Sequence, residues 1–477
     1  MRTRLGRLLG IVARPVGDEA RALLARNWAG LTDALRVPQQ MFGRQGNGCG
    51  ATIGVMPRCD FACRGCYLTG EANRVPAAPV DEIKAQMRAL RPVLGHAGNL
   101  QLTDGEVTLR PVEELVELLR YARSLGMIPM LMTHGDAFRR RPGLLERLMV
   151  DGGLTEVSIH IDTTQRGRTG DGYRHAADEA ALDPLRDELA AMIRRARRAT
   201  RRPLRAAMTM TVTRDNLAGV PGVLRWLLRN ADAFRMISFQ PVAQVGRTEG
   251  GYGGGVSVDA LWDGIASGLG VRGADRVRRL AVWFGHSGCN RMVNGVVVTR
   301  GATSRFHGLR DADDATDVRV VDGFLERFGG ISFRLDRAAE RVARLLGVVR
   351  AAPRFVLGNL APYGLHWLRR VGDGRAVRGA WRLATRAARV RPLVIVSHHF
   401  MSPAELETPD GRERLAHCVF RVPLDGNLVS MCAVNALGGR ERYYAQLRRA
   451  HGPGEGTSAA GGELPARFRG PAAEGRC

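Results

Sequence analysis

Three closely spaced cysteines, Cys59, Cys63 and Cys66, are the residues of this chain with the clearest capacity for chemistry. They lie in the stretch MPRCDFACRGCYL and form a CxxxCxxC pattern. A four-iron, four-sulfur (4Fe–4S) cluster takes four thiolates when it is saturated, so three thiolates leave one iron open to a small ligand. A zinc site and a chance spacing are the alternative explanations. The residues that follow the triplet favour the iron–sulfur explanation.

Polar residues stand at the ends of the apolar runs that follow the triplet. In parallel α/β folds the working residues lie at the carboxyl ends of the strands, so these positions are candidates for one site. In TDGEVTLRP, two acids could bind a cationic group, and a glycine between them lets the backbone come close. Alternatively, Asp104 or Thr103 caps a helix that begins at Pro111. The candidate positions are Asp104, Gly105, Glu106, His160, Asp162, Asn216 and Gln240.

The triplet and the TDGEV segment resemble the radical SAM superfamily. The resemblance implies that the open iron chelates S-adenosylmethionine (SAM), and that an electron from the cluster cleaves the sulfonium to a 5′-deoxyadenosyl radical. It also implies that Asp104, Gly105 and Glu106 correspond to the glycine–glycine–glutamate motif, which receives the ammonium group of SAM. Because the order is shifted in this chain, the ammonium role could belong to either acid. Glu106 is the candidate catalytic acid.

The resemblance implies further cofactor contacts after the later runs. Asp162 corresponds to a position that binds ribose, and Arg166 or Arg168 could pair with the methionine carboxylate in a bidentate manner. Asn216 has the donor and acceptor that the same task requires. Turn formation is the alternative role for each of these residues. The segment from Gln240 to Arg247 corresponds to the stretch that meets the adenine edge.

Two more residues are candidates on weaker grounds. Many members of the superfamily carry an aromatic residue just before the third cysteine, whereas this chain has Gly65 there and Tyr67 after the cysteine. Contact between Tyr67 and adenine is therefore expected only by analogy. His160 alternates with Ile159 and Ile161 and is a candidate catalytic residue that points into the barrel. A histidine satisfied within the core is the alternative.

Strand and helix patterns alternate from about residue 50 to residue 245 and must position these residues. The strand patterns are ATIGVM, NLQLT, MIPMLM, TEVSIHI, RAAMTMTV and FRMISFQ, which are short, apolar and rich in branched residues. The helix patterns between them are DEIKAQMRALRPVL, PVEELVELLRYARSLG, GLLERLMV, DPLRDELAAMIRRARRA and VPGVLRWLLRNA. Crossovers of this length allow parallel pairing. The pattern predicts six β–α units, and the resemblance implies a partial (β/α)6 barrel.

A second group of cysteines occurs later in the chain. Cys418 and Cys432 flank an expected hairpin built on PLDGN, and Cys289 lies alone in FGHSGCNRM. If the fold brings them together, three thiolates could hold an auxiliary iron–sulfur cluster. Buried free cysteines are the alternative, because this spacing is far less specific than that of the first triplet.

Several later segments, including SHHFMS, the MC dipeptide after the hairpin and the earlier ISFQPV, resemble one branch of the superfamily. That branch contains the archaeal tetraether lipid synthases and related pterin methylases, which couple or alkylate unactivated carbon atoms with several auxiliary clusters. The resemblance extends over about residues 46–445. The sequence shows no N-terminal rubredoxin-like pair of CxxC motifs and fewer later cysteines than that branch. Lipid coupling is therefore not transferred to this chain.

The chain divides into five regions by composition. The predicted regions are an N-terminal helical extension (1–45), the partial barrel (46–248), a basic and mostly helical insertion (249–390), a small C-terminal α+β hairpin region with the auxiliary cysteines (391–450) and a disordered tail (451–477). EGGYGGG is the expected joint after the barrel. The tail is rich in glycine and proline and low in apolar residues.

The formal net charge of +24 raises the question of an anionic partner. Lys84 is the only lysine, and the arginines are scattered through helical stretches, which favours a solvated surface over a nucleic-acid groove. LAPYGLHWLRR could lie on a membrane surface or be a packed helix with a basic outer face. The opening MRTRLGRLLGIVARP is too short and interrupted for a secretory signal, and no run reaches the length of a membrane span. The expected location is the reducing cytoplasm.

Together these features predict a radical SAM enzyme, an oxidoreductase or transferase whose cofactors are a 4Fe–4S cluster, SAM and an optional second cluster. The radical would abstract hydrogen from an unactivated carbon of an unknown apolar or lipid-like small molecule. The expected electron donor is a reducing partner such as ferredoxin or flavodoxin. The alternatives are a peptide- or natural-product-modifying radical SAM enzyme and, from another class, a non-catalytic iron–sulfur or zinc protein that binds RNA.

Overall fold

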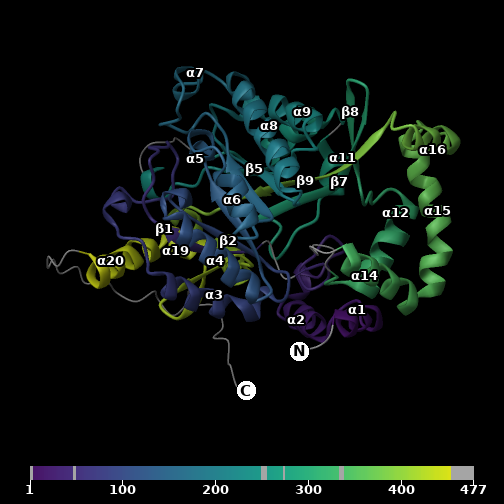
Figure 1. Cartoon of the computed structure of the whole chain (residues 1–477), viewed down its shortest axis with the longest axis horizontal. Coiled ribbons are helices and arrows are strands. Elements are labelled where there is room, and N and C mark those ends of the chain that lie inside the picture. The colour runs from purple at the N-terminus through teal and green to yellow at the C-terminus, as the bar shows by residue number, and fades with distance from the viewer. Residues whose placement is uncertain (1–3, 47–49, 249–254, 272–273, 332–337, 453–477) are drawn as a thin grey trace.

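A single sheet of eleven strands forms the centre of the molecule (Figure 1). A computed structural model of the chain describes residues 4–46, 50–248, 255–271, 274–331 and 338–452. The strand order is β11–β10–β1–β2–β3–β4–β5–β6–β9–β7–β8, so the sheet is open, with β11 and β8 at its edges. The predicted joint at 249–255 falls almost entirely outside the described residues, as does nearly all of the predicted tail at 451–477.

The six predicted strands are confirmed and lie next to one another in chain order. They are β1 (Ala51–Met56), β2 (Asn99–Asp104), β3 (Ile128–Thr133), β4 (Glu156–His160), β5 (Arg205–Val212) and β6 (Phe234–Pro241). Each pairs in parallel with the next. Sequential parallel order is the product of repeated right-handed β–α units. The fold is therefore the predicted α/β partial (β/α)6 barrel.

Helices connect these strands. The five predicted helices are α3 (Val80–Leu94), α4 (Val112–Ser124), α6 (Leu144–Val150), α8 (Asp183–Thr200) and α9 (Val220–Arg229). Two short helices, α5 (Asp136–Arg140) and α7 (Asp171–Arg174), were not predicted. In α3 the buried side chains are Ile83, Met87, Leu90 and Leu94, whose spacing places them on one face of the helix. That face packs in the main core together with strand residues such as Leu100 and Leu102.

The two faces of the barrel strands differ in polarity, and this difference creates the site. In β4, Val157 and Ile159 are fully buried in the main core, whereas Ser158 and His160 line an interior cavity. In β5, Met208 and Met210 alternate in the same way with Thr209 and Thr211. Because successive side chains of a strand point to opposite faces, one face supplies the core and the other supplies polar groups to the cavity.

The region 249–390 contains strands that the sequence interpretation missed. Its helices are α10 (Val258–Leu269), α11 (Ala274–Leu280), α12 (Ala315–Asp317), α13 (Gly323–Phe328), α14 (Ala338–Ala351), α15 (Pro353–Val371) and α16 (Ala376–Ala384). Between α11 and α12, however, β7 (Asn290–Arg300) and β8 (Thr303–Gly308) form an antiparallel hairpin. β7 joins the main sheet through β9 (Arg389–His398), which pairs in parallel with β6. The insertion is therefore helical with an added sheet edge.

The predicted C-terminal hairpin is confirmed as β10 (Arg421–Leu424) and β11 (Asn427–Ser430). Asp425 and Gly426 both have positive φ, 51° and 72°, as a two-residue type I′ turn requires. β10 also pairs in parallel with β1, through Arg421 and Ala51. Around this hairpin lie α17 (Pro403–Leu406), α18 (Pro409–Ala416), α19 (Met431–Ala436) and α20 (Gly439–His451).

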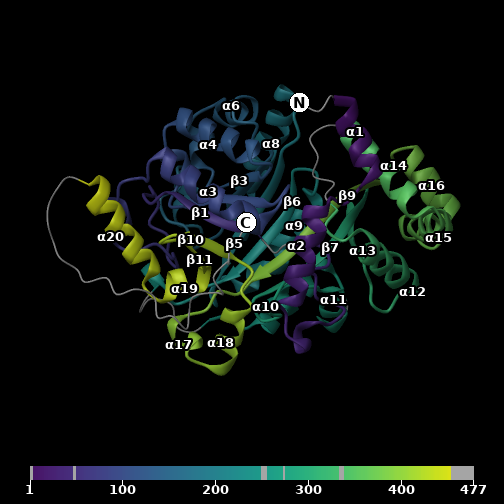
Figure 2. The same ribbon diagram turned by 90° about the horizontal axis from the view of Figure 1, so that it is seen from below.

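Some of the helices outside the barrel lie at two opposite ends of the molecule. The first predicted region contains α1 (Arg4–Ala13) and α2 (Asp18–Ala29), and α1 packs against α14. α14, α15 and α16 lie at one end, and α20 lies at the other, as two perpendicular views show (Figures 1 and 2).

Candidate active site

A cavity of about 190 Å³ lies at the carboxyl ends of the barrel strands. The barrel supplies polar groups to it, and the C-terminal region supplies Phe400, Phe420, Met431 and Asn435. Among the residues predicted from the sequence, nine line this one cavity: Cys59, Cys63, Cys66, Tyr67, Asp104, Gly105, Glu106, His160 and Gln240. Asp162, Arg166 and Asn216 do not line it.

The cysteine loop follows β1 and is held by backbone hydrogen bonds from two later loops. The amides of Ala62 and Arg64 donate to the carbonyls of Arg166 (3.0 Å) and Thr164 (2.9 Å) after β4. The amide of Arg247, after β6, donates to the carbonyl of Cys66 (2.8 Å). Two later loops of the barrel, after β4 and after β6, therefore fix the position of the cysteine loop.

Two glycines let the neighbouring loops approach this segment. A Cβ on Gly246 (φ +58°) would lie 2.4 Å from the carbonyl oxygen of Tyr67. A Cβ on Gly105 would lie 2.2 Å from the carbonyl oxygen of Arg58. The predicted close approach at Gly105 therefore occurs, and its partner is the backbone of the cysteine loop.

The thiol groups fit a multi-iron cluster better than a single zinc ion. All three are free, and burial raises the pKa of Cys59 to about 12, with further contributions from Glu106 and Cys66. Zinc–sulfur bonds of 2.3 Å in a tetrahedron place the sulfurs about 3.8 Å apart. Among the described residues, Cys59 groups within 4.8 Å with Asp60 and His134, whereas the three thiols do not form a group that tight. A larger cluster requires this wider spacing.

Glu106 lies after β2 with its carboxylate buried. Its Oε1 accepts hydrogen bonds from the Thr108 amide (3.0 Å) and from the hydroxyls of Thr108 (2.6 Å) and Thr133 (2.7 Å). Its Oε2 accepts from the His134 amide (2.9 Å) and lies 3.2 Å from His134 Nε2. The bond to Thr108 caps the short helix Val107–Leu109. Amides and hydroxyls therefore fix the orientation of a carboxyl group that lines the cavity.

His134 links this acid to the cysteine loop. Its Nδ1 accepts from the Asp136 amide (3.1 Å), so the proton resides on Nε2, which donates to Asp60 (2.8 Å). The ring stacks on Phe61 with a centroid separation of 3.7 Å. The hydrogen bond from His134 lowers the pKa of Asp60, and Arg140 lowers it further against the effect of burial. Asp60 is thereby held as an anion beside Cys59.

The carboxylate of Asp104 is engaged by the C-terminal helix. Arg440 of α20 donates to Oδ1, and the Tyr444 hydroxyl donates to Oδ2 (2.8 Å). Tyr67 donates its hydroxyl to the Asp104 carbonyl (2.8 Å) and packs its ring under the Arg440 guanidinium at 4.6 Å. Burial raises the pKa of Asp104, and the charge of Arg440 opposes that shift. The negative charge of Asp104 is therefore matched within the protein.

His160 and Asp162 form a hydrogen-bonded pair at the end of β4. His160 Nε2 lies 2.5 Å from Asp162 Oδ2 and 3.1 Å from the Thr211 hydroxyl. Asp162 also accepts from the amides of Thr211 (2.7 Å) and Thr164 (2.8 Å). Burial would raise the pKa of Asp162, but His160, the Thr164 hydroxyl and the Thr211 amide lower it below its usual value. His160 faces the cavity, and Asp162 lies behind it as its partner.

Arg166 and Asn216 line a separate hollow of about 540 Å³ rather than the cavity. Arg166 donates to the carbonyl of Thr163 (2.6 Å), and Asn216 donates to Glu179 (3.0 Å) and accepts from the Thr213 amide (2.8 Å). Arg168, the other candidate for the carboxylate, is buried and donates to the carbonyl of His134 (2.9 Å). These groups stabilise the loops after β4 and β5.

Several residues of the cavity escaped the sequence interpretation. Thr52, Gln101, Ser158, Thr209 and Thr211 lie within strands, and their alternation with buried apolar residues was the signal that could have revealed them. The wall residues Phe400, Phe420, Met431 and Asn435 come from the C-terminal region. No spacing signal relates that wall to the barrel, because tertiary structure alone brings the two together.

The second group of cysteines comes together behind this wall. Burial raises the pKa of Cys432, and the neighbouring thiols Cys418 and Cys289 raise it further. Burial likewise raises the pKa of Cys289 to about 11, with Cys418 contributing and Arg414 opposing. Cys418 donates to the carbonyl of the wall residue Phe420 (3.4 Å). These thiols therefore lie next to the wall residues and do not line the cavity themselves.

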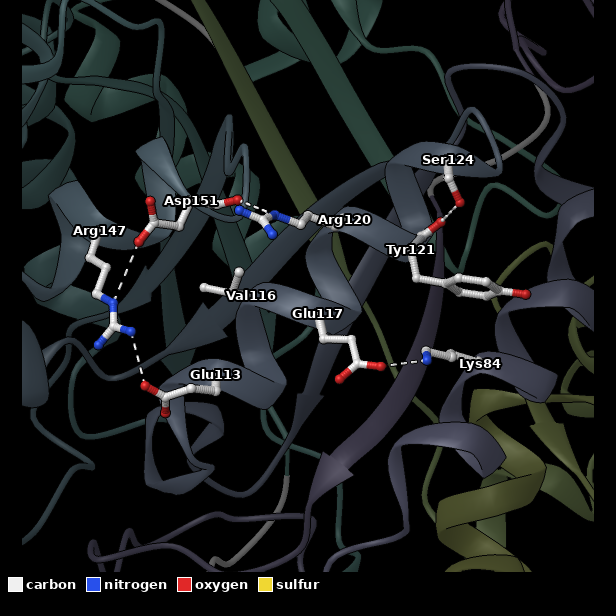
Figure 3. A pocket seen from close by; sticks show the side chains of 9 residues that line it. All are labelled: Lys84, Glu113, Val116, Glu117, Arg120, Tyr121, Ser124, Arg147 and Asp151. Carbon is white, nitrogen blue, oxygen red and sulfur yellow. Dashed lines mark hydrogen bonds and ion pairs between the residues drawn. The ribbon is translucent and has the colours of Figure 1, made fainter.

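The outer face of α4 carries a larger hollow, of about 660 Å³, which belongs to a different part of the surface. Its charged side chains form ion pairs with one another, as Figure 3 shows: Lys84 pairs with Glu117 (2.5 Å), and Arg147 pairs with Glu113 (2.9 Å). None of the residues lining the hollow lines the reaction cavity. Its ion pairs explain its polarity without a ligand.

Comparisons with known proteins agree with this site. Residues 53–227 match the radical SAM superfamily. The 7,8-dihydro-6-hydroxymethylpterin dimethyltransferase of Methanocaldococcus jannaschii is 25% identical over 203 residues, which are 42% of this chain and 37% of that protein. The chain thus matches well under half the length of this curated relative.

Solved structures of two enzymes are also similar in part. SuiB of Streptococcus suis, bound to its precursor peptide SuiA, shares 14% identity over 51% of this chain and 49% of its own, with a TM-score of 0.35. The FeFe-hydrogenase maturase HydG of Carboxydothermus hydrogenoformans shares 13% identity over 56% of this chain and 64% of its own, with a TM-score of 0.34. At these TM-scores neither likeness carries an argument.

The matched segment 53–227 contains the cysteine triplet, the Asp104–Glu106 segment and the carboxyl ends of β1 to β5. These are the elements that the sequence and the cavity place together. Residues 53–227 therefore form a radical SAM domain, and enzymes with this domain use a 4Fe–4S cluster and SAM as cofactors.

Proposed function

We propose that Cys59, Cys63 and Cys66 hold the catalytic cluster and that the enzyme abstracts hydrogen from an unactivated carbon of an apolar small molecule. When bound, the cluster and SAM supply the 5′-deoxyadenosyl radical for this abstraction. The observation that carries the proposal is the composition of the cavity. Thiols and polar strand residues of the barrel line it together with an apolar wall from the C-terminal region, Phe400, Phe420 and Met431.

Among the two acids after β2, we assign the ammonium of SAM to Glu106. Arg440 already supplies a positive charge that matches Asp104. The hydrogen-bond donors to Glu106 are neutral amides and hydroxyls. His134 Nε2 also lies near Glu106, but it donates its proton to Asp60. A buried anion without a countercharge attracts a cation strongly. His160, positioned by Asp162, is assigned to the polar side of the cavity, where it can exchange a proton with bound ligand.

The apolar wall favours an apolar substrate over a peptide substrate. A peptide carries an amide donor and acceptor at nearly every residue, and each needs a partner when buried. The wall offers aromatic and thioether surface to such a ligand, with Asn435 as its polar member. A reducing partner is required as the source of electrons, and the superfamily's reductants of the ferredoxin or flavodoxin class are the candidates.

The experiment is an anaerobic turnover assay with the reconstituted full chain, SAM and dithionite. We expect 5′-deoxyadenosine as a product, and a purified protein that contains iron and sulfide. Candidate apolar substrates are then screened as deuterated compounds, because transfer of deuterium into 5′-deoxyadenosine identifies the carbon that reacts. A protein that contains only zinc and forms no 5′-deoxyadenosine would contradict the proposal and would favour a non-catalytic metal protein.

Cys289, Cys418 and Cys432 are proposed to hold a second iron–sulfur cluster. Cys418 raises the pKa of both Cys432 and Cys289, which shows that the three thiols are neighbours. The Arg414 guanidinium beside Cys289 supplies positive charge that would offset the negative charge of a thiolate-bound cluster. The amide of Met401 points to the Cys432 sulfur at 3.5 Å, as amides do around clusters. Iron counting on cysteine variants tests this site.

We further propose that α14–α16 contact an anionic membrane surface, from which an apolar substrate would be drawn. None of the described helices is long and apolar enough to cross a membrane. On α16, Val377 and Trp381 are one turn apart and 84% and 62% exposed. α14 exposes a stripe at Val342, Leu345, Leu346 and Val349. The segment 338–388 contains ten arginines and two acidic residues, which matches anionic headgroups.

Vesicle co-sedimentation measures this contact. We expect the full chain to bind vesicles of phosphatidylglycerol and phosphatidylcholine, to bind phosphatidylcholine alone weakly, and to be released at high salt. The double variant Val377→Asp, Trp381→Asp should lose most of this binding. Val150→Asp is the matched control, because Val150 is an exposed apolar residue (45%) on α6. Equal binding of both variants would refute the assignment of the surface.

A further inference from the structure

Three metal-ligating side chains meet between α12 and α15, outside the reaction cavity. Asp314 precedes α12, Asp317 ends it, and His366 lies on α15. One ligand atom from each lies within 4.8 Å of the other two. α12 and α15 pack together at the end of the molecule opposite α20 (Figures 1 and 2). The group therefore has no part in the site that holds the catalytic cysteines.

Within the part of the chain that the structure describes, two buried atoms of this group have no hydrogen-bond partner. The side chain of Asp317 is 0% exposed, and its Oδ2 accepts from Arg370 (2.7 Å) and from the Asp311 amide (3.1 Å). The two atoms without a partner among the described residues are Asp317 Oδ1 and His366 Nε2. These two atoms face each other at 3.3 Å, although a buried polar atom of a folded protein nearly always has a partner. Something that binds both atoms is expected at this point.

The spacing suits a tetrahedral metal ion. His366 Nε2 lies 3.3 Å from Asp317 Oδ1 and 3.4 Å from Asp314 Oδ2. Zinc bonds to nitrogen and oxygen of 2.0–2.2 Å, arranged in a tetrahedron, place the ligand atoms about 3.3–3.6 Å apart. An imidazole together with two carboxylates is a donor set for zinc-class cations, whereas magnesium prefers oxygen ligands alone.

The surroundings orient the carboxylates for this task. The second oxygen of Asp314 accepts from the amides of Thr316 (2.9 Å) and Asp317 (3.1 Å), which leaves Oδ2 facing His366. Arg370 lies 2.7 Å from Asp317 Oδ2 and 3.4 Å from Asp314 Oδ2, so one positive charge faces two negative ones. The residual negative charge favours a cation. Second-layer contacts of this kind are typical of metal sites.

We propose that Asp314, Asp317 and His366 bind one zinc-class divalent cation that fastens α12 to α15. Water completes the fourth position. The site is independent of the radical chemistry and stabilises the helical end of the molecule. The competing explanation is an ion pair between a protonated His366 and the two aspartates, without metal.

The test uses the full chain with its clusters reconstituted, so that the thiols are occupied. Zinc is measured by elemental analysis, and Co²⁺ is added to zinc-free protein to record visible absorption. We expect one equivalent of zinc per chain, tetrahedral cobalt bands without a sulfur charge-transfer band, and a rise in melting temperature on adding Zn²⁺ but not Mg²⁺. Asp317→Asn and His366→Gln should each lose the metal and the rise. His366→Gln should form 5′-deoxyadenosine as the wild type does.

A matched control is available on α20. His451 Nε2 lies 3.4 Å from Glu82 Oε2, the same separation, but both side chains are about one-third exposed. His451→Gln should retain the zinc. Wild-type protein that neither contains zinc nor binds Zn²⁺ or Co²⁺ would overturn the proposal and leave the ion pair. Equal zinc content in wild type and His366→Gln would also overturn it, because the metal would then lie elsewhere.

Discussion

Replacing Cys63 by alanine should lower the formation of 5′-deoxyadenosine by at least about a thousand-fold, because a cluster held by two thiolates is lost or cannot present its open iron. Cys63 is one of three thiols that line the cavity, and its pKa is raised by burial and by the neighbouring cysteines. Neutral thiols bind metal only after they release their protons, so none of the three is dispensable. The measurement is product quantified per chain in anaerobic single turnovers.

Iron and sulfide counts on matched variants separate the two groups of cysteines. The triple alanine variant of the first group should retain about four irons per chain if the second site holds a 4Fe–4S cluster. Cys432→Ala should lose those irons and keep the catalytic cluster with its 5′-deoxyadenosine formation. Cys477→Ala removes a cysteine outside both groups and should match the wild type. If the triple variant retains no iron, the proposal of a second cluster is refuted. The proposal of the catalytic cluster is unaffected by that result.

Replacing Arg440 by alanine should lower the free energy of unfolding by about 3–5 kcal/mol, because it leaves Asp104 as a buried charge without a partner. Both side chains are more than nine-tenths buried, and Tyr67 and Tyr444 pack around them. The change is measured by denaturant unfolding of the metal-free protein under reducing conditions. Arg448→Ala on the same helix is the control: its guanidinium is 41% exposed and lies 3.8 Å from Glu71, so its loss should cost less than about 1 kcal/mol.

A double variant tests the division of roles between the two acids. Asp104→Asn with Arg440→Met removes both charges of the buried pair, so its cost should be smaller than that of Arg440→Ala alone. It should also keep SAM cleavage within about tenfold of the wild type, whereas Glu106→Gln should lose about a hundred-fold or more. The reverse order of activities would assign the ammonium of SAM to Asp104.

The barrel was predictable because its signals are local. Each strand from β1 to β6 is a short apolar run, and each helix between them has one apolar face. The β7–β8 hairpin was missed although GVVVTR is a β-branched run, because the surrounding arginine-rich segments read as helix. The PLDGN turn was predictable since only a few residue types adopt positive φ at two successive positions.

The sequence predicted the part of the site that the ends of neighbouring strands supply. Cysteine spacing and the acids after β2 pointed to one edge of the sheet, and nine of the predicted residues line the cavity there. Sequence could not distinguish Asp104 from Glu106, because the partner of Asp104 lies 336 residues away on α20. It also placed Arg166 and Asn216 among the ligands, although their hydrogen bonds stabilise loops beside another hollow. Long-range pairing of charges leaves no periodic trace in a sequence.

The parallel pairing of β10 with β1 joins the last part of the sheet to the first. About 365 further residues must be synthesised after β1 before Arg421 can pair with Ala51. At typical ribosomal speeds this synthesis takes roughly 20–70 s. Throughout that interval one edge of the strand that precedes the cysteine loop has no neighbour, and the apolar wall from the C-terminal region is absent. In the nascent chain the cysteine loop therefore follows a strand with one unpaired edge until the C-terminal region has been synthesised.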